Sequence, residues 1–518
     1  QFTQDWKNLG MSCDFDISYS TIDKESQKLS QKSFIELFKK KEIYEREFPS
    51  LWCPECQTSI AQAELEDKEF PSLFSTLKFS CDGNTSKGTR DLLIATTRPE
   101  LLGACVAIFV NPKDKKHKSL IGKKAKVPLF DYEVPILGDY SAEIEKGTGA
   151  MMICSYGDKC DVDAIVRHKL TPKIIFNIDG TLNLGKYKGM KIKDARNQIL
   201  EDLDKLGLIK EQKKVDHVVN CHDKCGTPIE FISTKQWFIK ILDKKEKLIE
   251  QGKKIKWYPE FMQKRYINWV EGLEWDWNIS RDRHFGVPIP VWKCSEGCGE
   301  IILPDEKELP VDPLQTKKIC KKCKKQAIGE SRVLDTWATS SLTPQIASSL
   351  VENKVVVPFS LRPQAHDIIR TWAFYTIVKS YLHEKKIPWE NVMISGFVRL
   401  GGEKMSKSKG NVIDPQKVMD EFGSDALRFW AAGSKLGEDL NYQEKDLVTG
   451  KKIITKLLNA SNFVFMNLKD FDGKKPKELR LVDEFFLNST FNLVNKVGKY
   501  FLDYEYSKAK SEIENFFW

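Results

Sequence analysis

The stretch Gly401-Gly402-Glu403-Lys404-Met405-Ser406-Lys407-Ser408-Lys409-Gly410-Asn411 decides how the rest of this sequence is interpreted. Lys404 and Lys407 stand on a loop flanked by glycines, which permit backbone conformations that other residues rarely adopt. Such a loop can close over a triphosphate and neutralise the charge that develops on a leaving pyrophosphate. The pattern predicts an ATP-binding loop with Lys404 and Lys407 as its catalytic groups; the alternative is an exposed lysine-serine loop. The predicted ATP contacts are Lys404, Met405, Ser406, Lys407 and Ser408.

The composition places this loop in a large globular protein. The 518 residues are too many for one hydrophobic core, so two to four domains are expected. No run approaches the roughly 18 apolar residues that a membrane span needs, and the N-terminal residues show no signal-peptide pattern. The net charge of +9 suits a partner rich in phosphate, although solubility explains it equally well. Lysine-dense stretches at 39–41, 253–254 and 317–325 are most simply interpreted as solvated faces.

The cysteines follow a metal-binding pattern. Eight of the 13 fall into four close pairs, which in a long chain without a signal peptide indicates metal in a reducing cytosol. The pairs at 294–298 and 320–323, with 21 residues between them, outline a four-thiolate zinc ribbon. The pair at 53–56 finds a second pair only at 221–225, so a zinc there would clamp the base of the intervening segment. His222 with Cys225 has the usual knuckle spacing, and Cys221 with Cys225 is the alternative. The predicted zinc ligands are Cys53, Cys56, His222, Cys225, Cys294, Cys298, Cys320 and Cys323, with free buried thiols as the alternative.

Further motifs stand around the ATP-binding loop in a fixed order. They are Ile279–Pro290 (ISRDRHFGVPIP), Leu334–Trp337 (LDTW), His366–Trp372 (HDIIRTW) and Gly423–Trp430 (GSDALRFW). Together with the 404–408 segment, which matches a KMSKS loop, they resemble the class I aminoacyl-tRNA synthetases of the isoleucyl, valyl and leucyl group. The resemblance covers essentially the whole chain. It implies an α/β fold with a Rossmann-type catalytic domain, ATP with Mg²⁺ as a substrate, and tRNA as a partner.

The resemblance also suggests which amino acid is activated. Thr96-Thr97-Arg98-Pro99-Glu100 is similar to the valyl branch, whereas the isoleucyl and leucyl branches usually carry a Thr-Pro-Trp version. The segment 435–439 (KLGED) resembles archaeal members of that branch. The implied activity is ATP-dependent activation of valine and its transfer to tRNA(Val). On the family pattern Trp337, Asp367, Ile368 and Trp372 form the valine pocket, and ordinary core packing is the alternative for the three apolar side chains.

Two other functions remain open at this point. An isoleucyl-tRNA synthetase is disfavoured by the Arg98-Pro99-Glu100 sequence. A tRNA-binding or trans-editing protein that is not a synthetase would lack the ATP-binding His-x-Gly-His element, and none of the seven histidines here stands in that pattern. The family places that element upstream of Gln1, so we expect that this chain by itself cannot form an adenylate.

The segment between the first two cysteine pairs has short β-prone runs separated by turns, which predicts a compact inserted module. A pocket shaped for valine cannot strongly reject isosteric threonine, so a second, hydrolytic site is needed. The resemblance places this editing site on Thr96, Thr97, Arg98, Glu100, Asp158 and Asp161. The sequence reads Ser-Tyr-Gly-Asp at 155–158 where the family more often has Pro-Ala-His-Asp, so no histidine role is implied. The alternative is that these are ordinary turn residues.

These expectations divide the chain into successive parts. Residues 1–65 begin the catalytic domain, 66–216 form the insert, and 217–395 complete the catalytic domain with a zinc ribbon at 294–323. Residues 396–445 carry the KMSKS loop and stem-contact region, and 446–518 are a truncated helical anticodon-binding domain. Helices are expected over 31–45 and 367–382, and a strand over 392–398. A monomeric cytoplasmic protein is expected, with no membrane partner.

Overall fold

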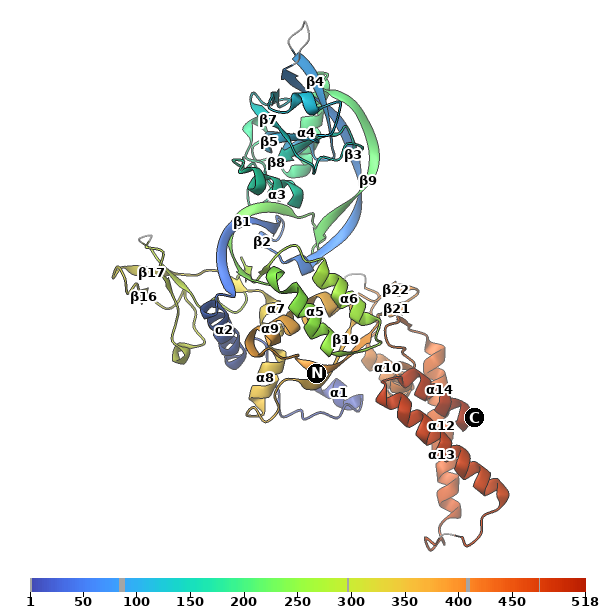
Figure 1. Ribbon diagram of the computed structural model, residues 1–518. Helices are drawn as coiled ribbons and strands as arrows, with labels where there is room; N and C mark the ends of the chain where they lie inside the picture. Colours follow the sequence, from blue (N-terminus) through green and yellow to red (C-terminus); the bar gives the residue numbers. More distant parts are fainter. Residues whose placement is uncertain (1, 83–88, 296–297, 407–409, 475) are drawn as a thin grey trace. The chain divides into compact units, whose positions relative to one another are not determined.

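The computed structural model of the chain describes residues 2–82, 89–295, 298–406, 410–474 and 476–518 (Figure 1). Two compact units are each assembled from separate segments of sequence. The first unit contains Gln1–Ser33, Asp243–Leu273 and Thr336–Trp518, and the second contains Phe34–Leu242 and Glu274–Asp335. No helix in the described part of the chain is long and apolar enough to cross a membrane.

A parallel three-stranded sheet lies at the centre of the first unit. Its strands, in spatial order, are β11 (Lys256–Tyr258), β20 (Trp389–Ser395) and β19 (Phe359–Ala365). The neighbouring helices are α5 (Lys245–Lys254), α6 (Met262–Glu271) and α9 (Phe374–Glu384), with α7 (Thr336–Ser340) and α8 (Thr343–Leu350) preceding β19. Val392 and Ile394 of β20 are completely buried and lie on the same face of this central strand. Because ligands bind beyond the carboxyl ends of such strands, the residues that follow β19 and β20 are in the position of a binding site.

The residues after β20 form a small sheet and then a run of helices. The small sheet contains β21 (Val398–Leu400), β22 (Glu403–Lys404) and β23 (Leu440–Asn441). The helices are α10 (Pro415–Phe422), α11 (Ser424–Ala431), α12 (Glu444–Asn467), α13 (Leu481–Leu502) and α14 (Tyr506–Phe517). A short helix, α1 (Phe2–Asn8), begins the unit, and Arg428 Nη1 donates to the carbonyl oxygens of Leu9 and Gly10 just after it.

The second unit begins with a four-stranded antiparallel sheet, from which a long ribbon leads into a larger sheet. The first sheet contains β12 (Trp277–Asn278), β10 (Glu230–Ile239), β1 (Ile43–Cys53) and β2 (Thr58–Ser59), in that order. The ribbon is β3 (Leu65–Asp82) paired with β9 (Ile209–His222), from Leu65 opposite His222 onward. Around it stand β4 (Thr89–Thr96), β5 (Cys105–Val110), β6 (Lys124–Lys126), β7 (Glu133–Gly138) and β8 (Ala150–Cys154), with helices α3 (Lys159–His168) and α4 (Ile192–Lys205).

This seven-stranded sheet has its own hydrophobic core. Leu77, Phe79, Ile94 and Ile108 are among its fully buried side chains, and Leu203 of α4 joins them. Because β3 enters the sheet and β9 leaves it side by side, the inserted module is continuous with a two-stranded stem (Figure 1). The module therefore begins and ends at neighbouring positions.

Two further small sheets complete the second unit. One pairs β13 (Ser280–Arg281) with β18 (Val333–Leu334). The other has the order β15 (Ile301–Ile302), β14 (Trp292–Cys294), β17 (Gln326–Gly329) and β16 (Lys318–Ile319), and it carries the cysteine pairs at 294–298 and 320–323.

The structure corrects three of the predicted elements. The strand expected over 392–398 is β20, which starts at Trp389 and ends at Ser395. The helix expected over 31–45 ends earlier: α2 spans Lys24–Lys39, and Ile43 already starts β1, because its backbone pairs with Ile239 of β10. The helix expected over 367–382 is three consecutive elements, namely a 3-10 turn η7 (His366–Ile368), a π-helical turn η8 (Ile369–Ala373) and α9. The early end of α2 arises from tertiary pairing with β10, which residue periodicity does not record.

Candidate functional site

The predicted ATP-binding loop begins on a hairpin of the first unit. β21 and β22 turn at Gly401 and Gly402, whose φ angles of 60° and 86° are readily adopted only by glycine. Lys404 Nζ lies 3.3 Å from Asp367 Oδ2 and 3.7 Å from the centroid of the Phe397 ring. About half of the Lys404 side chain remains exposed (50%), so its ammonium can exchange partners at little cost.

Asn411, after the ATP-binding loop, is hydrogen-bonded to the residues at the start of that loop. Its Oδ1 accepts a hydrogen bond from the Ser406 amide at 2.8 Å, and its Nδ2 donates to the Lys404 carbonyl at 3.2 Å. Met405 is fixed by its amide, which donates to the Val398 carbonyl. Lys407 and Ser408, two of the predicted ATP contacts, lie outside the described residues.

The four predicted valine-pocket residues come from two neighbouring segments of the first unit. Trp337 lies on α7, Asp367 and Ile368 lie on η7, and Trp372 lies on η8. Trp372 Nε1 donates to the carbonyl of Ser340 at 3.1 Å, which ties η8 to the end of α7. Trp337, Ile368 and Trp372 are each half-buried rather than buried, which is the exposure expected of side chains that line a cavity.

Arg362 was not singled out in the sequence, although it contacts this set. Its Cζ lies 3.4 Å from the centroid of the Trp372 ring and 5.6 Å from that of Trp389. Burial lowers the pKa of the Arg362 guanidinium to about 10. Its stacking on the indole fixes one face of Trp372. An arginine inside a strand has no sequence signal for this role.

Asp439 is a second residue whose role became visible only in the structure. Its Oδ1 accepts the Phe397 amide at 2.7 Å, and its Oδ2 accepts from Arg399 Nε at 2.5 Å. The sequence marked Asp439 only as part of a family segment. Its contacts anchor the chain between β20 and β21, directly before the ATP-binding loop.

In the insert, Arg98 is the centre of a buried ionic network. Its Nη2 donates to both carboxylate oxygens of Glu230, at 2.7 and 2.9 Å, and its Nε donates to Glu100 Oε1 at 3.0 Å. Its Nη1 donates to the Gly157 carbonyl at 3.2 Å, and Arg196 of α4 makes two further hydrogen bonds to Glu100. Burial alone would raise the pKa of the Glu100 carboxyl, but Arg98 and Arg196 hold it below its usual range.

This network changes the interpretation of two predicted editing residues. Glu100 is completely buried, and Arg98 is occupied by partners on three different segments, since Glu230 belongs to β10. Both residues therefore hold the insert to the β10 strand. Glu230 and Arg196 carry no motif that could have identified them from the sequence.

Asp158 and Asp161 lie at the start of α3. The Asp158 side chain caps the helix by accepting the Asp161 amide at 2.8 Å. Asp161 Oδ1 accepts the Cys154 amide and Oδ2 accepts the Gly157 amide, both at 3.1 Å. Burial, together with the charge of Asp158, raises the pKa of the Asp161 carboxyl to about 8 despite these two backbone donors.

Thr96 and Thr97 stand on the segment between β4 and the η2 turn (Pro99–Ala104). Thr96 is almost buried, and its Oγ1 accepts the Arg98 amide at 2.9 Å. Thr97 is half-exposed, so its hydroxyl can reach a ligand. The Arg98 hydrogen bond to Gly157 joins this segment to the Asp158–Asp161 turn.

The structure brings the two sets of predicted metal ligands together. Cys53, Cys56, His222 and Cys225 have one ligand atom each within 4.8 Å of all the others, and so do Cys294, Cys298, Cys320 and Cys323. The sulfurs of Cys53 and Cys225 are 3.5 Å apart, and those of Cys298 and Cys320 are 3.6 Å apart. Two sulfurs of a tetrahedral zinc site are separated by about 3.8 Å, given Zn–S bonds of about 2.3 Å. Both donor sets fit such an ion.

The geometry of the first set shows which residue of the 221–225 segment faces the other ligands. His222 Nδ1 lies 3.5 Å from Cys56 Sγ and 3.4 Å from Cys225 Sγ. Cys221 points elsewhere, toward the carbonyl of Val219. Burial lowers the pKa of the His222 imidazole, which favours the neutral form that a metal requires.

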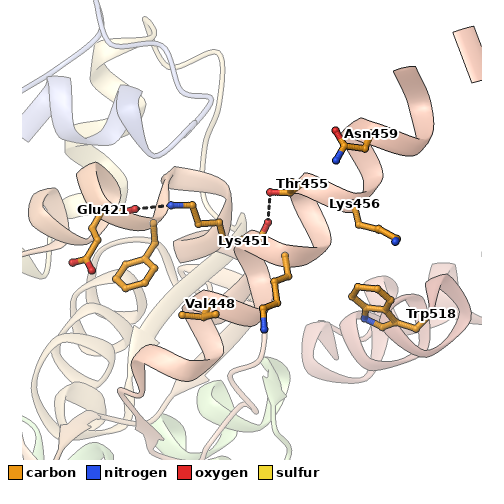
Figure 2. A pocket seen from close by; sticks show the side chains of 9 residues that line it. Glu421, Val448, Lys451, Thr455, Lys456, Asn459 and Trp518 are labelled. Atoms are coloured by element: carbon orange, nitrogen blue, oxygen red, sulfur yellow. Dashed lines mark hydrogen bonds between the residues drawn. The ribbon is translucent and has the colours of Figure 1, made fainter. Parts of the chain in front are cut away.

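A pocket that involves none of the predicted residues lies in the helical part of the first unit (Figure 2). Its volume is about 520 Å³, and α12 supplies much of its wall. Lys451 Nζ donates to the Glu421 carbonyl at 2.9 Å, which joins α12 to α10. The lining residues are Glu421, Phe422, Val448, Lys451, Lys452, Thr455, Lys456, Asn459 and Trp518.

Known proteins resemble this chain in both sequence and structure. The family described as tRNA synthetases class I (I, L, M and V) matches residues 1–443. The chain is 44% identical to the valine–tRNA ligase of Thermoplasma volcanium over 527 residues, covering 99% of this chain and 65% of that protein. It is also 44% identical to the valine–tRNA ligase of Methanocaldococcus jannaschii, and this match covers 99% of this chain and 59% of that protein. The chain thus spans less than two thirds of the length of these relatives.

Solved structures show the same fold at low sequence identity. One is a LeuRS of Agrobacterium radiobacter K84 in a ternary complex with tRNA and LeuAMS. The match covers 99% of this chain and 70% of the LeuRS chain, with a TM-score of 0.53 and 17% sequence identity. Another is Mycobacterium tuberculosis methionyl-tRNA synthetase in complex with methionyl-adenylate. This match covers 100% of this chain and 67% of the synthetase chain, with a TM-score of 0.50 and 15% sequence identity. The predicted Rossmann-type α/β fold is confirmed by these neighbours. The chain therefore belongs to the class I tRNA synthetases of the isoleucine, leucine, methionine and valine group.

Proposed function

We propose that the protein is a valine–tRNA ligase that activates valine with ATP and transfers it to tRNA(Val). The observation that carries this proposal is the 44% identity with enzymes of that name over 99% of this chain. The Thr97-Arg98-Pro99-Glu100 sequence, typical of the valyl branch, supports it from within the chain. The protein would act in the cytoplasm as a monomer, where its cysteines remain reduced.

In the first step the valine carboxylate attacks the α-phosphate of ATP, and pyrophosphate leaves. The Lys404 and Lys407 ammonium groups neutralise the charge on the departing phosphates, with Mg²⁺ sharing it. The half-exposed Lys404 can leave Asp367 for a phosphate because the ion pair holds it weakly. In the second step a terminal hydroxyl of the tRNA attacks the activated carbonyl, and no covalent protein nucleophile is required.

Valine selection would come from Trp337, Ile368 and Trp372. Their half-buried apolar surfaces suit a branched aliphatic side chain. Asp367, released when Lys404 contacts phosphate, can accept hydrogen bonds from the valine ammonium. Arg362 and the Ser340 carbonyl keep the Trp372 indole in one orientation, so the pocket wall is preorganised.

The insert would remove threonine that has been attached to tRNA(Val). Asp161 is the group suited to bind the ammonium of the esterified amino acid, since an approaching cation favours its ionised form. Thr96 and Thr97 form the opposite side of this site. Arg98 and Glu100 act differently from Asp161, because they position the turn and the insert rather than contact the substrate.

The two cysteine-rich clusters would each hold one zinc ion. Cys53 and Cys56 precede β3, and His222 and Cys225 lie at the end of β9, so all four stand at the same end of the stem and an ion there fixes the base of the insert. A structural zinc supplies binding free energy only in the folded state, which stabilises the geometry around it.

The amino acid specificity can be tested on the full-length protein by ATP–pyrophosphate exchange with valine, isoleucine and threonine. Valine should give the highest kcat/KM, with isoleucine activated at most weakly. Faster exchange with isoleucine would assign the protein to the isoleucyl branch, and the absence of exchange with all three would contradict the synthetase activity.

The metal assignment can be tested by elemental analysis. We expect about two zinc ions per chain, because eight ligands form two tetrahedral sets. Cys320→Ser should remove one and leave the other, with Cys13→Ser as the control that removes none. A wild-type content of one zinc or fewer would contradict the assignment.

A further inference from the structure

The lysines of one hairpin in the second unit have no role in the function described above. β16 and β17 pair antiparallel through Lys318 opposite Ala327 and Ile319 opposite Gln326. Residues 320–325 form the tip of this hairpin, with Cys320 and Cys323 as two of the four clustered thiols. Two backbone hydrogen bonds close the tip, from Cys320 to the Lys325 carbonyl and from Lys324 to the Cys320 carbonyl. The tip is therefore a closed turn, called the knuckle below.

The lysine side chains of this knuckle carry a strong positive charge. Residues 317–325 (KKICKKCKK) contain six lysines and no acidic residue. Lys318 pairs with Glu308 and lies over the Trp292 ring. The other five lysines are exposed and form no ion pair with any residue that the structure describes: Lys317, Lys321, Lys322, Lys324 and Lys325.

The first turns of α5, another lysine-rich segment, lack this property. Helix α5 alternates lysines with acidic residues, and Lys247 pairs with Glu250. On such a surface the acidic side chains neutralise much of the lysine charge. Five unpaired ammonium groups on one knuckle repel one another, and an anionic partner relieves this repulsion.

Apolar side chains stand next to the charge. Ile319 and Ile328 are 65% and 64% exposed. Ile319 is directly opposite Gln326, and Ile328 is two residues further along β17, so the two isoleucines lie on the same face of the hairpin. The surface thus offers unpaired cations beside an aliphatic patch that no described residue covers.

We propose that this surface, the lysine knuckle (Lys317, Ile319, Lys321, Lys322, Lys324, Lys325 and Ile328), binds the sugar-phosphate backbone of tRNA. The inference rests on the proposed function, which supplies a polyanionic partner. Lysines bind phosphate as point charges and need no base sequence, so the knuckle contributes affinity rather than tRNA identity. Because the thiol cluster fixes the backbone of the tip, little backbone entropy is lost when the lysines meet phosphates. The isoleucines can pack against ribose.

The test uses full-length protein carrying Lys321→Gln, Lys322→Gln and Lys325→Gln together. Lys324 is left intact because its φ of 60° makes substitution there harder to interpret. Dissociation constants for tRNA(Val) and for unfractionated tRNA are measured across salt concentrations. We expect Kd to rise about 10- to 100-fold near 0.1 M salt for both RNAs, and the slope of log K against log salt to fall by about 2 to 3.

A matched control removes the same charge elsewhere. Lys253→Gln, Lys254→Gln and Lys256→Gln lie on another exposed lysine-rich stretch of the chain. This variant should change Kd by less than about threefold, which excludes a general effect of net charge. Zinc content and valine-dependent ATP–pyrophosphate exchange without tRNA should stay at the wild-type level in both variants, which excludes misfolding.

Unchanged tRNA affinity in the knuckle variant, or equal losses in the two variants, would overturn the inference. Failure of the proposed function has a different signature. If the wild-type protein binds tRNA but shows no valine-dependent ATP–pyrophosphate exchange, the proposed amino acid specificity is contradicted. The tRNA affinities of the wild type and the knuckle variant can still be compared in that case with unfractionated tRNA. If the knuckle variant loses zinc, the double variant Lys317→Gln with Lys325→Gln is used instead. For this variant we expect the slope of log K against log salt to be lower than that of the wild type by about 1 to 2.

Discussion

Lys404 and Arg98 are both cations at predicted chemical sites, and their surroundings differ sharply. Lys404 is half-exposed and meets one carboxylate, that of Asp367, at 3.3 Å. Arg98 is 22% exposed and donates to Glu100, to both oxygens of Glu230 and to the Gly157 carbonyl. A weakly held cation can move to a substrate phosphate, whereas a cation with all its partners in place maintains a shape. This difference is the one expected between a group proposed to act in the chemistry and a group proposed to position one.

The largest effect should come from removing a partner of Arg98. Glu230→Ala leaves a largely buried guanidinium with an unsatisfied charge and should destabilise the insert by about 3–5 kcal/mol. Native-state hydrogen exchange of β4 and β5 amides measures this. Glu66→Ala, which breaks a solvent-exposed pair with Lys68, is the control and should cost under about 1 kcal/mol. Similar costs for the two substitutions would mean that the network is not a positioning element.

The next effect concerns Lys404. In the full-length protein, Lys404→Gln should lower the kcat of valine-dependent exchange by about 10²- to 10³-fold, since one preorganised charge is lost from the transition state. Hydrolysis of threonyl-tRNA(Val) should be unaffected. Lys417→Gln, an exposed lysine of α10, is the control. An equal decrease in both reactions would indicate a folding defect instead of a catalytic one.

Asp161→Ala should produce the reverse pattern. Hydrolysis of threonyl-tRNA(Val) should fall by about 10²-fold, because the charge-assisted contact to the ammonium is lost, while valine activation remains. Asp163→Ala changes the same helix at an exposed position paired with Lys159, and it should have little effect. If Asp161→Ala hydrolyses as fast as the parent, the editing role of this residue is wrong.

The smallest effect is a pH dependence of stability. The pKa of Asp161 is raised to about 8 in the folded chain, above an ordinary value of 3.8. The folded state therefore holds a proton that the unfolded state releases, and stability from this group is lost as pH rises from about 4 to about 8. Asp161→Asn should remove that loss. Its stability relative to wild type should increase as pH rises through this range, measured by denaturant unfolding. A constant difference across pH would contradict the raised pKa.

The sequence made several features predictable because their signals are local. Cys320-x2-Cys323 and the glycine-flanked Lys404 segment each fit within a single turn or loop; the structure gathers Cys320 and Cys323 with two further thiols and turns the chain at Gly401 and Gly402. The helices of 446–518 follow an apolar periodicity that does not depend on distant residues. Local periodicity failed at residues 43–45, where apolar spacing resembles a helix and pairing with β10 imposes a strand.

The amino-acid sequence by itself determined the family, the motifs and the candidate ligands of the two metal clusters. Only the tertiary structure decided which of these residues meet. His222 Nδ1, rather than Cys221, faces Cys56 from 166 positions away in the chain, and Arg98 meets Glu230 from 132 positions away. Such contacts depend on how β9 and β10 return beside β3 and β1, and a pairing register fixes which side chains share a face. Residue spacing carries no information about that register, which is why Glu230, Arg196 and Arg362 became visible only in the fold.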